Sequence, residues 1–264
     1  IFFYLSLFLS LIIKFKKTSY TRFILTLFFI SILSLIVYFT AERKTILLLV
    51  IFLFFYIFLI INNKKSKIIL VLISVIISSL IILLTPAVIK DRVFNHTISS
   101  IKLNQFPNDV YFNQDKIFDN FNFFSSQHEV YFYTAFNIFK DNMIFGSGPS
   151  TFRKQCIYDK YMAHTDIAIS CSTHPHNFYI QALSETGIIG LLFIIMFLFF
   201  NFWIIFFKKS NKNSKNLILN SFCLINICNF FPFIPTGSLF NNANSLILFI
   251  SIIFTLYYYF NYES

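Results

Sequence analysis

Seven long apolar runs, separated by polar segments, dominate the hydropathy pattern of this chain. A membrane-spanning helix needs about 20 apolar residues, which several runs approach, and the shorter ones can borrow flanking residues. No Asp, Glu, Lys, Arg or His lies inside any run. The pattern therefore predicts an all-α polytopic membrane protein with about seven visible transmembrane helices. The predicted spans are residues 1–13, 23–39, 46–61, 68–84, 188–207, 217–231 and 246–260.

The composition of the chain favours the same class. Apolar residues make up 57% and charged residues 12% of the 264 residues, whereas about 25% of the residues in a soluble domain are charged. The first run has neither the basic segment nor the cleavage site of a signal peptide. Because the chain begins with Ile1 and is apolar from there on, we expect it to be the C-terminal part of a longer protein, with further helices upstream.

The apolar runs divide the chain into three regions. We expect four transmembrane helices in residues 1–89, a large loop in 90–187 and three transmembrane helices in 188–264. Short loops rich in Lys and Arg face the cytoplasm, so alternation of the spans places the large loop on the periplasmic side. The net charge of +10 then follows mainly from topology, and no single basic patch favours nucleic acid. The basic residues that define the cytoplasmic side are Lys14, Lys16, Lys17, Arg22, Lys64, Lys65, Lys67, Lys208, Lys209, Lys212 and Lys215.

One segment of the large loop has helical periodicity. Tyr133, Phe136 and Met143 recur at helical spacing within residues 129–145. Their aromatic character predicts a helix lying on the membrane interface. The sequence Gly-Ser-Gly-Pro at residues 146–149 is expected to end it as a turn, since it lacks the Lys-Ser/Thr that follows in a phosphate-binding loop.

The four cysteines fall into two pairs. Cys156 and Cys171 lie fifteen residues apart in the large loop, where an oxidising compartment would permit a disulfide. Closing a loop of that size would stabilise the fold by about 3 kcal/mol in the chain-entropy model. Cys223 and Cys228 fall within a predicted span, where we expect them to pack as small apolar residues.

The most informative stretch is residues 172–190, which joins the large loop to the fifth span. Pro175 suits the first turn of a helix, with Thr173 or His174 as its cap. An unbroken helix would place His176 at the membrane surface on one stripe with Gly187 and Gly190, two glycines that would admit a neighbouring helix. His174 would then point to another face of the helix. With no CxxC or HExxH motif, we expect no metal and no cofactor.

Two sequence patterns resemble those of one protein superfamily. His176-Asn177, nine further residues and then Gly187-Ile-Ile-Gly190 resembles a motif of the O-antigen ligase and O-antigen polymerase superfamily. Arg-x-x-x-Leu, a second family feature in a short periplasmic turn, is matched by Arg43 to Leu47. Four spans, a large periplasmic loop and three spans are also similar to the C-terminal half of that family. The resemblance covers most of the chain as topology and about thirty residues as sequence pattern.

The resemblance implies a metal-independent glycosyltransferase of the bacterial inner membrane, with its active site on the periplasmic side. The donor would be a glycan on undecaprenyl diphosphate. The acceptor would be a sugar hydroxyl of lipid A-core for an O-antigen ligase, or of a second lipid-linked glycan for a polymerase. The sequence does not separate these two activities. Either activity would belong to lipopolysaccharide biosynthesis in the cell envelope.

The resemblance also assigns roles to residues. His176 would activate or orient the acceptor hydroxyl, because an imidazole ordinarily titrates near neutrality. Arg43 would bind the diphosphate through its planar fork of donors. The family carries a second arginine in the large loop. The candidate substrate-binding residues are Arg153, Arg92, Asn177 and His128.

Several alternative interpretations remain open. Asn177 would either orient His176 or cap the backbone, and Arg43 would either bind the diphosphate or be an anchor at a helix end. A flippase for lipid-linked sugars would ordinarily carry ionisable residues or broken helices near the middle of the membrane, which these spans lack. A scaffold protein would need no histidine–arginine pair facing one compartment.

Overall fold

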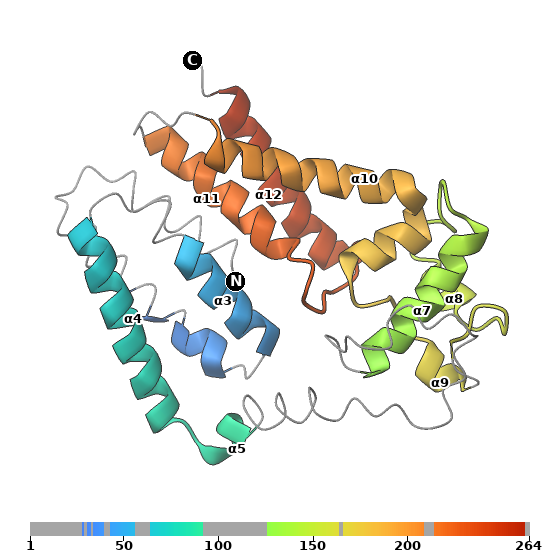
Figure 1. Ribbon diagram of the computed structural model, residues 1–264, viewed down its shortest axis with the longest axis horizontal. Coiled ribbons are helices and arrows are strands. Elements are labelled where there is room, and N and C mark those ends of the chain that lie inside the picture. Colours follow the sequence, from blue (N-terminus) through green and yellow to red (C-terminus); the bar gives the residue numbers. More distant parts are fainter. Residues whose placement is uncertain are drawn as a thin grey trace. The chain divides into compact units, whose positions relative to one another are not determined.

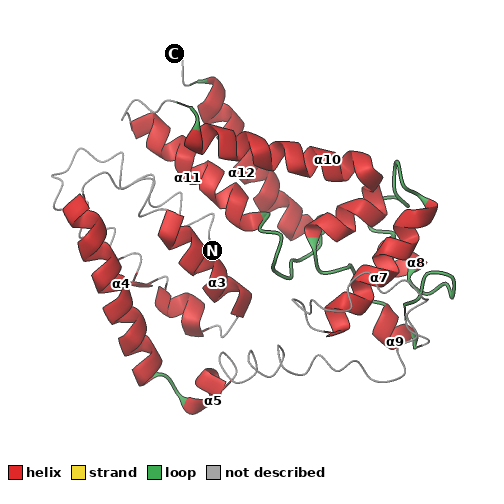
Figure 2. Cartoon of the chain, in the orientation of Figure 1, coloured by secondary structure: helices red, strands yellow, loops and turns green. Residues whose placement is uncertain are grey.

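The computed structural model describes residues 28, 31–32, 34–39, 43–55, 64–91, 126–163, 166–208 and 214–261. Throughout these residues the regular elements are helices and there is no strand (Figure 2), which confirms the all-α prediction for this part of the chain. In chain order they are α3 (Arg43–Phe55), α4 (Lys64–Leu84), α5 (Ala87–Lys90), α7 (Ser126–Asp141), α8 (Phe152–Gln155), α9 (Ile167–Ser170), α10 (Phe178–Phe206), α11 (Ser214–Asn229) and α12 (Asn242–Phe260).

Two of the described helices, α10 and α12, are long and apolar enough to cross a membrane. Shorter apolar helices cover Lys44–Phe55 and Ile218–Asn229. The number of seven spans and the sidedness of the large loop stay predictions. The first predicted span, residues 1–13, lies outside the described residues.

The chain forms two compact units, and each is built from separate stretches of sequence. The first unit contains Ile1–His96, Leu198–Asn229 and Ile247–Ser264. The second unit contains Thr97–Phe197 and Phe230–Leu246. Both α10 and α12, which are labelled in Figure 1, therefore contribute residues to each unit.

Polar side chains tie three helices of the first unit together. Asn226 of α11 donates hydrogen bonds to Asn201 Oδ1 of α10 at 3.0 Å and to Thr255 Oγ1 of α12 at 2.9 Å. Its own Oδ1 accepts a hydrogen bond from Ser251 Oγ at 2.7 Å. All four side chains are buried. Inter-helix hydrogen bonds of this kind hold apolar helices together where the hydrophobic effect cannot.

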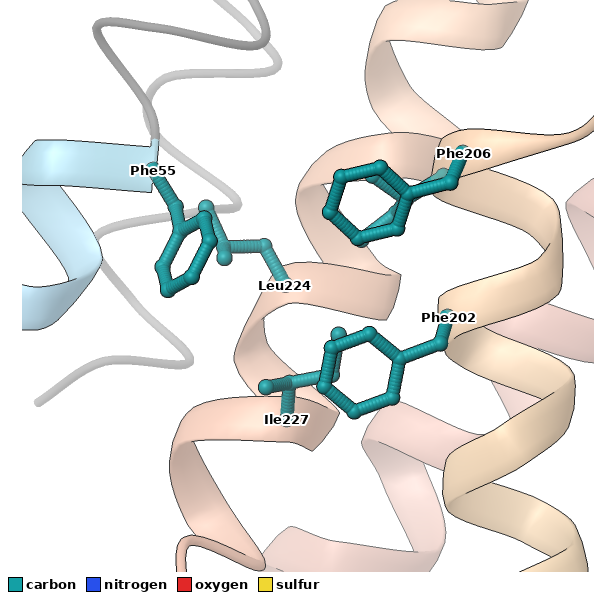
Figure 3. A pocket seen from close by; sticks show the side chains of 6 residues that line it. Phe55, Phe202, Phe206, Leu224 and Ile227 are labelled. Carbon is teal, nitrogen blue, oxygen red and sulfur yellow. The ribbon is translucent and has the colours of Figure 1, made fainter.

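Apolar packing completes this part of the first unit. Cys223 and Cys228 are buried free thiols of α11, and Cys223 packs with Ile204 and Leu219. A small crevice near α11 is lined entirely by apolar side chains (Figure 3), so it provides no group that could recognise a sugar or a phosphate. Its lining residues are Phe55, Phe202, Ile205, Phe206, Leu224 and Ile227.

The second unit is organised around α7. This helix lies close to the predicted position, but it begins at Ser126 and ends at Asp141 rather than spanning 129–145. Its buried face carries Tyr131, Ala135 and Ile138, which pack against Phe152 and neighbouring residues. Because that core forms on one side of α7, the stripe through Tyr133 and Phe136 that the sequence singled out is left partly or fully exposed.

Covalent and polar links close the loop that follows α7. A disulfide joins Cys156 to Cys171. At the end of α7, Asp141 accepts hydrogen bonds from Lys160 Nζ at 2.8 Å and from Tyr161 Oη at 2.9 Å. These two hydrogen bonds, first of all the one from Lys160, hold the pKa of Asp141 below its ordinary value. The disulfide therefore connects the end of α8 to the segment that leads into α10.

Candidate functional site

The start of α10 is fixed by Asn177. Its Oδ1 accepts hydrogen bonds from the backbone N–H groups of Tyr179 at 3.0 Å and Ile180 at 3.2 Å, which caps the helix. Its Nδ2 donates to the carbonyl of Pro232 at 2.9 Å. Neither Thr173 nor His174 is the cap, so that prediction is wrong. Of the two roles left open for Asn177, the structure gives it the capping role.

His176 lies before the helix rather than on its surface. Its backbone φ of 61° is in the left-handed region, which histidine visits more readily than most residues other than glycine. The helical stripe predicted through His176, Gly187 and Gly190 is therefore wrong. The reason is that α10 begins only at Phe178, with Asn177 as its cap. His176 therefore lies in the turn before the helix, and helical geometry does not determine the direction of its side chain.

The His176 ring is part of a group of four rings, which we call the histidine cluster: His128, Tyr131, His174 and His176. The centroid of the His176 ring lies 4.1 Å from that of His174, 5.4 Å from that of His128 and 5.7 Å from that of Tyr131. The two histidines that a helix would have separated are thus neighbours. His176 itself is partly exposed, which leaves it accessible to a substrate.

Hydrogen bonds hold two of these rings. His176 Nε2 lies 3.0 Å from Ser172 Oγ, and the carbonyl of His176 accepts the N–H of Thr236 at 2.7 Å. His174 Nε2 lies 3.1 Å from the carbonyl of Thr236, so it must carry the proton. Its Nδ1 then accepts from Thr173 Oγ1 at 2.9 Å. Thr236 lies in the turn between α11 and α12, so this turn holds both His174 and His176 in place.

A break in α10 lies eleven residues after His176. Gly187 has φ 69° and ψ −167°, which interrupts the helix. The carbonyls of Ser184 and Glu185 accept the N–H groups of Ser147 at 3.0 Å and Gly148 at 2.9 Å instead of partners in their own helix. The loop between α7 and α8 thus replaces the helical hydrogen bonds that the break removes.

Glycine is required at the break. A Cβ atom on Gly187 would overlap the backbone of the residues at 144–146, and one on Gly146 would overlap the backbone at 185–187. The close neighbour of Gly187 is therefore a loop rather than a second helix. At Gly190 an added Cβ would meet the side chain of Thr186 in the same helix.

A fully buried carboxylate lies just before the break. Glu185 Oε1 accepts the N–H of Phe152 at 2.8 Å, and Oε2 accepts Gln181 Nε2 at 2.9 Å. The same Gln181 amide donates to Ser238 Oγ at 2.9 Å and accepts the N–H of Leu239 at 2.9 Å. This chain of bonds fixes α8 and the turn near Ser238 to the first part of α10.

The arginines predicted to bind substrate have different positions. Arg153 follows Phe152 in α8 and is exposed, so the contact between Glu185 and Phe152 determines where it is presented. Arg43 is the first residue of α3, in the first unit. Arg92 lies outside the described residues.

The first turn of α7 contributes His128 to the site. The next residue, Glu129, is partly buried, and this burial raises the pKa of its carboxyl to about 7. In the part of the chain that the structure describes, no three His, Cys, Asp or Glu side chains are grouped to hold a metal ion. The rings of the histidine cluster contact one another by their faces and edges.

Reasoning from sequence missed several residues of this site. Tyr131, Ser172, Gln181 and Glu185 received no role, and the contacts of Thr236 bridge sixty-two residues of sequence to His174. A signal existed for Glu185 and Gln181, since polar side chains one helical turn apart precede a long apolar run. No local pattern indicates Ser172, because its contact with His176 depends on the left-handed turn.

A family model places the chain among known proteins. The model for O-antigen ligase matches residues 27–195, which is well over half of the chain and includes Arg43, His176 and the Gly-x-x-Gly segment. Among curated proteins, none gives a significant match. The family comprises membrane glycosyltransferases of the O-antigen ligase and polymerase type, which use lipid-linked glycans. By this match, and with the apolar helices of a membrane protein, the chain belongs to the O-antigen ligase family.

Proposed function

We propose that this protein is an O-antigen ligase that transfers a glycan from undecaprenyl diphosphate to a sugar hydroxyl of lipid A-core. The reaction takes place on the periplasmic side of the inner membrane. The observation that carries the proposal is the position of His176, partly exposed inside the histidine cluster and immediately before a helix long enough to cross the membrane.

The proposed reaction is a single displacement at the anomeric carbon of the donor glycan. The acceptor hydroxyl forms a new bond to that carbon while the bond to the diphosphate oxygen breaks. The proton of the hydroxyl passes to the neutral imidazole of His176. Ser172 Oγ supports both forms of the ring, because a hydroxyl can donate to a bare nitrogen or accept from an N–H.

The neighbouring rings suit a histidine that becomes charged. The ring centroids of Tyr131 and His176 lie 5.7 Å apart, within the range at which an aromatic ring attracts a cation. Both ring nitrogens of His174 have hydrogen-bond partners, in Thr173 Oγ1 and the carbonyl of Thr236. A proton gained by His176 would therefore lie beside the aromatic ring of Tyr131.

The departing diphosphate needs positive charge. We assign that role to Arg43, with Arg153 as a second cation presented by α8, because a guanidinium offers paired donors to phosphate oxygens. Arg92 and His128 remain candidates for the same substrate. Asn177 is omitted from substrate binding, since its amide oxygen and nitrogen are used at the start of α10.

The test of the proposed function is a product assay with purified full-length protein. The donor is a glycan on undecaprenyl diphosphate, and the acceptors are lipid A-core and, in a parallel reaction, a second lipid-linked glycan. Glycan attached to lipid A-core is the expected product. Elongation of the lipid-linked glycan instead would identify a polymerase, and transport of the donor without any transfer would contradict both enzyme assignments.

Arg43 can be tested by a change that keeps its charge. Arg43→Lys should lower turnover by about one to two orders of magnitude, because lysine lacks the paired donors, which corresponds to a loss of about 1.4–2.8 kcal/mol in transition-state stabilisation. Membrane insertion and expression should be normal. Wild-type turnover in Arg43→Ala would leave the residue as an anchor at a helix end.

A further inference from the structure

The turn that follows α7 exposes three large apolar side chains in succession. Met143 is 53%, Ile144 59% and Phe145 76% exposed. Burying a side chain of this size is worth about 1.5–3 kcal/mol relative to leaving it in water. A contiguous apolar surface of this kind is typical of a site that contacts a partner or a membrane.

The position of this apolar turn is fixed by backbone hydrogen bonds. The N–H of Ile188 donates to the carbonyl of Met143 at 2.9 Å, and the N–H of Gly146 donates to the carbonyl of Asn142 at 2.9 Å. The turn and the helix are packed so closely at Gly146 and Gly187 that a Cβ atom on either glycine would overlap the backbone of the other segment. The turn is therefore held at the point where α10 breaks.

At this same point the surface of α10 changes character. Before the break, the polar side chains of Gln181 and Glu185 are buried. After it, the helix exposes a run of large apolar side chains that begins with Ile188 (47%) and continues to Phe193 (65%). The apolar turn is thus continuous with the exposed apolar surface of a helix that is long enough to span a membrane.

We propose that Met143–Phe145 inserts into the membrane beside α10, with lipid acyl chains as its partner. Continuity with the spanning helix favours lipid over a second protein, because α10 must already present that surface to acyl chains. The turn itself carries no charged residue. Lys140, one turn earlier on α7, is exposed and would reach phosphate groups of the lipids.

Insertion of the turn sets a depth for the histidine cluster. Residues 178–186 form the part of α10 between His176 and the break, and at 1.5 Å per residue they span at most about 14 Å. His176 lies two residues before the helix, so with Gly187 at the edge of the hydrocarbon it lies within about 20 Å of that edge, on the headgroup side. The relevance of this depth rests on the proposed function, because a His176 on the headgroup side of the membrane could reach a lipid-linked diphosphate.

The test measures the depth of a tryptophan in place of Phe145. Trp203 is the one tryptophan in the chain, so Phe145→Trp is made in a Trp203→Phe background. The full-length protein is reconstituted into vesicles that contain lipids brominated either near the headgroup or deep in the acyl chain. Lipids brominated near the headgroup should lower the tryptophan fluorescence at position 145 several-fold relative to unbrominated vesicles. Lipids brominated deep in the acyl chain should lower it less than the shallow ones do.

Ile157→Trp in the same background is the matched control. Ile157 is 49% exposed, similar to Met143, but lies in a segment that carries the exposed charges of Lys154, Asp159 and Lys160. Its fluorescence should respond to aqueous acrylamide and not to brominated lipid. Both variants should show the disulfide and the thermal unfolding of the parent protein.

Two outcomes would overturn the proposal. Quenching at position 145 by acrylamide alone would place the turn in water. Protection from acrylamide and from brominated lipid would mean that protein covers it. Neither measurement requires enzyme activity, so failure of this proposal and failure of the proposed glycosyltransferase function can be distinguished.

Discussion

The two parts of α10 on either side of Gly187 have opposite relations between polarity and burial. In residues 178–186, the side chains of Gln181, Ser184 and Glu185 are buried and hydrogen-bonded. In the part after the break, Phe193 and Phe199 are 65% and 70% exposed. One continuous helix by sequence therefore serves two environments. The first part packs against other segments of this chain, while the second has the apolar surface that lipid would cover.

Removing the break should have the largest effect on this contrast. Gly187→Ala should destabilise the protein by about 3 kcal/mol, since alanine is strained at φ 69° and its Cβ would overlap the backbone of the apolar turn. Glycan transfer should also be lost. Thermal unfolding in detergent measures the first effect.

Gly190→Ala is the matched control. Its added Cβ would meet Oγ1 and Cβ of Thr186 in the same helix, so the helix must shift locally, and the helix preference of alanine, up to about 1 kcal/mol, offsets part of that cost. It should lose clearly less stability than Gly187→Ala, because it has a helical φ and overlaps no backbone of another segment. Equal losses in the two glycine variants would mean that the break itself is unimportant.

The buried carboxylate before the break should have the next largest effect. Glu185→Ala leaves the Phe152 N–H without its acceptor and removes one of the two acceptors of the Gln181 amide nitrogen, at a cost of about 2–3 kcal/mol in unfolding free energy. Hydrogen exchange should show lost protection at the Phe152 amide. Glu185→Gln keeps one acceptor oxygen and should lose less. An alanine variant as stable as the glutamine variant would argue against this network.

The polar network in the first unit should respond more weakly. Asn226→Ala removes three inter-helix hydrogen bonds, each worth about 0.6 kcal/mol in a membrane, so the expected loss is about 2 kcal/mol. Asn229 lies one turn later in α11, and its Nδ2 has no hydrogen-bond partner in the described residues. Asn229→Ala should therefore cost clearly less, and thermal unfolding of the two variants side by side checks this order.

The smallest effect concerns Glu129 and pH. Its carboxyl has a pKa of about 7 in the folded protein, against 4.5 as the ordinary value, because burial disfavours the charged form. The folded state therefore holds this proton more tightly, and stability should fall as pH rises from 4.5 through 7. Solvent screens a partly exposed group, so the change should stay below about 1 kcal/mol. Glu129→Gln should flatten this part of the pH–stability curve, and an unchanged slope would contradict the assignment.

The sequence predicted α10 as a spanning helix because its apolar run is long and uninterrupted. It could not predict the break, since Gly-x-x-Gly is equally compatible with a glycine face that packs on another helix. What decides between them is the set of hydrogen bonds from a loop forty residues earlier. The same limit applies to α7, where periodicity found the helix but not the face that Phe152 would cover.

The candidate site was predictable as a motif but not as a geometry. His176 and Asn177 were identified from their spacing to the two glycines. Their arrangement was not, because Asn177 donates to the carbonyl of Pro232 and His176 accepts the N–H of Thr236, and both partners lie more than fifty residues away. Because His176 lies outside the helix, tertiary contacts determine its neighbours, and the helical rotation of 100° per residue does not.

The central claim is that the imidazole of His176 takes the proton of the acceptor, and one variant tests it most directly. His176→Asn keeps a residue that tolerates the left-handed turn while removing the imidazole. Transfer from an undecaprenyl-diphosphate glycan to lipid A-core should fall by about 10²–10⁴-fold. Asp159→Asn, at an exposed position away from the histidine cluster, should keep most of the activity. A His176→Asn protein that transfers glycan at the wild-type rate would contradict the account.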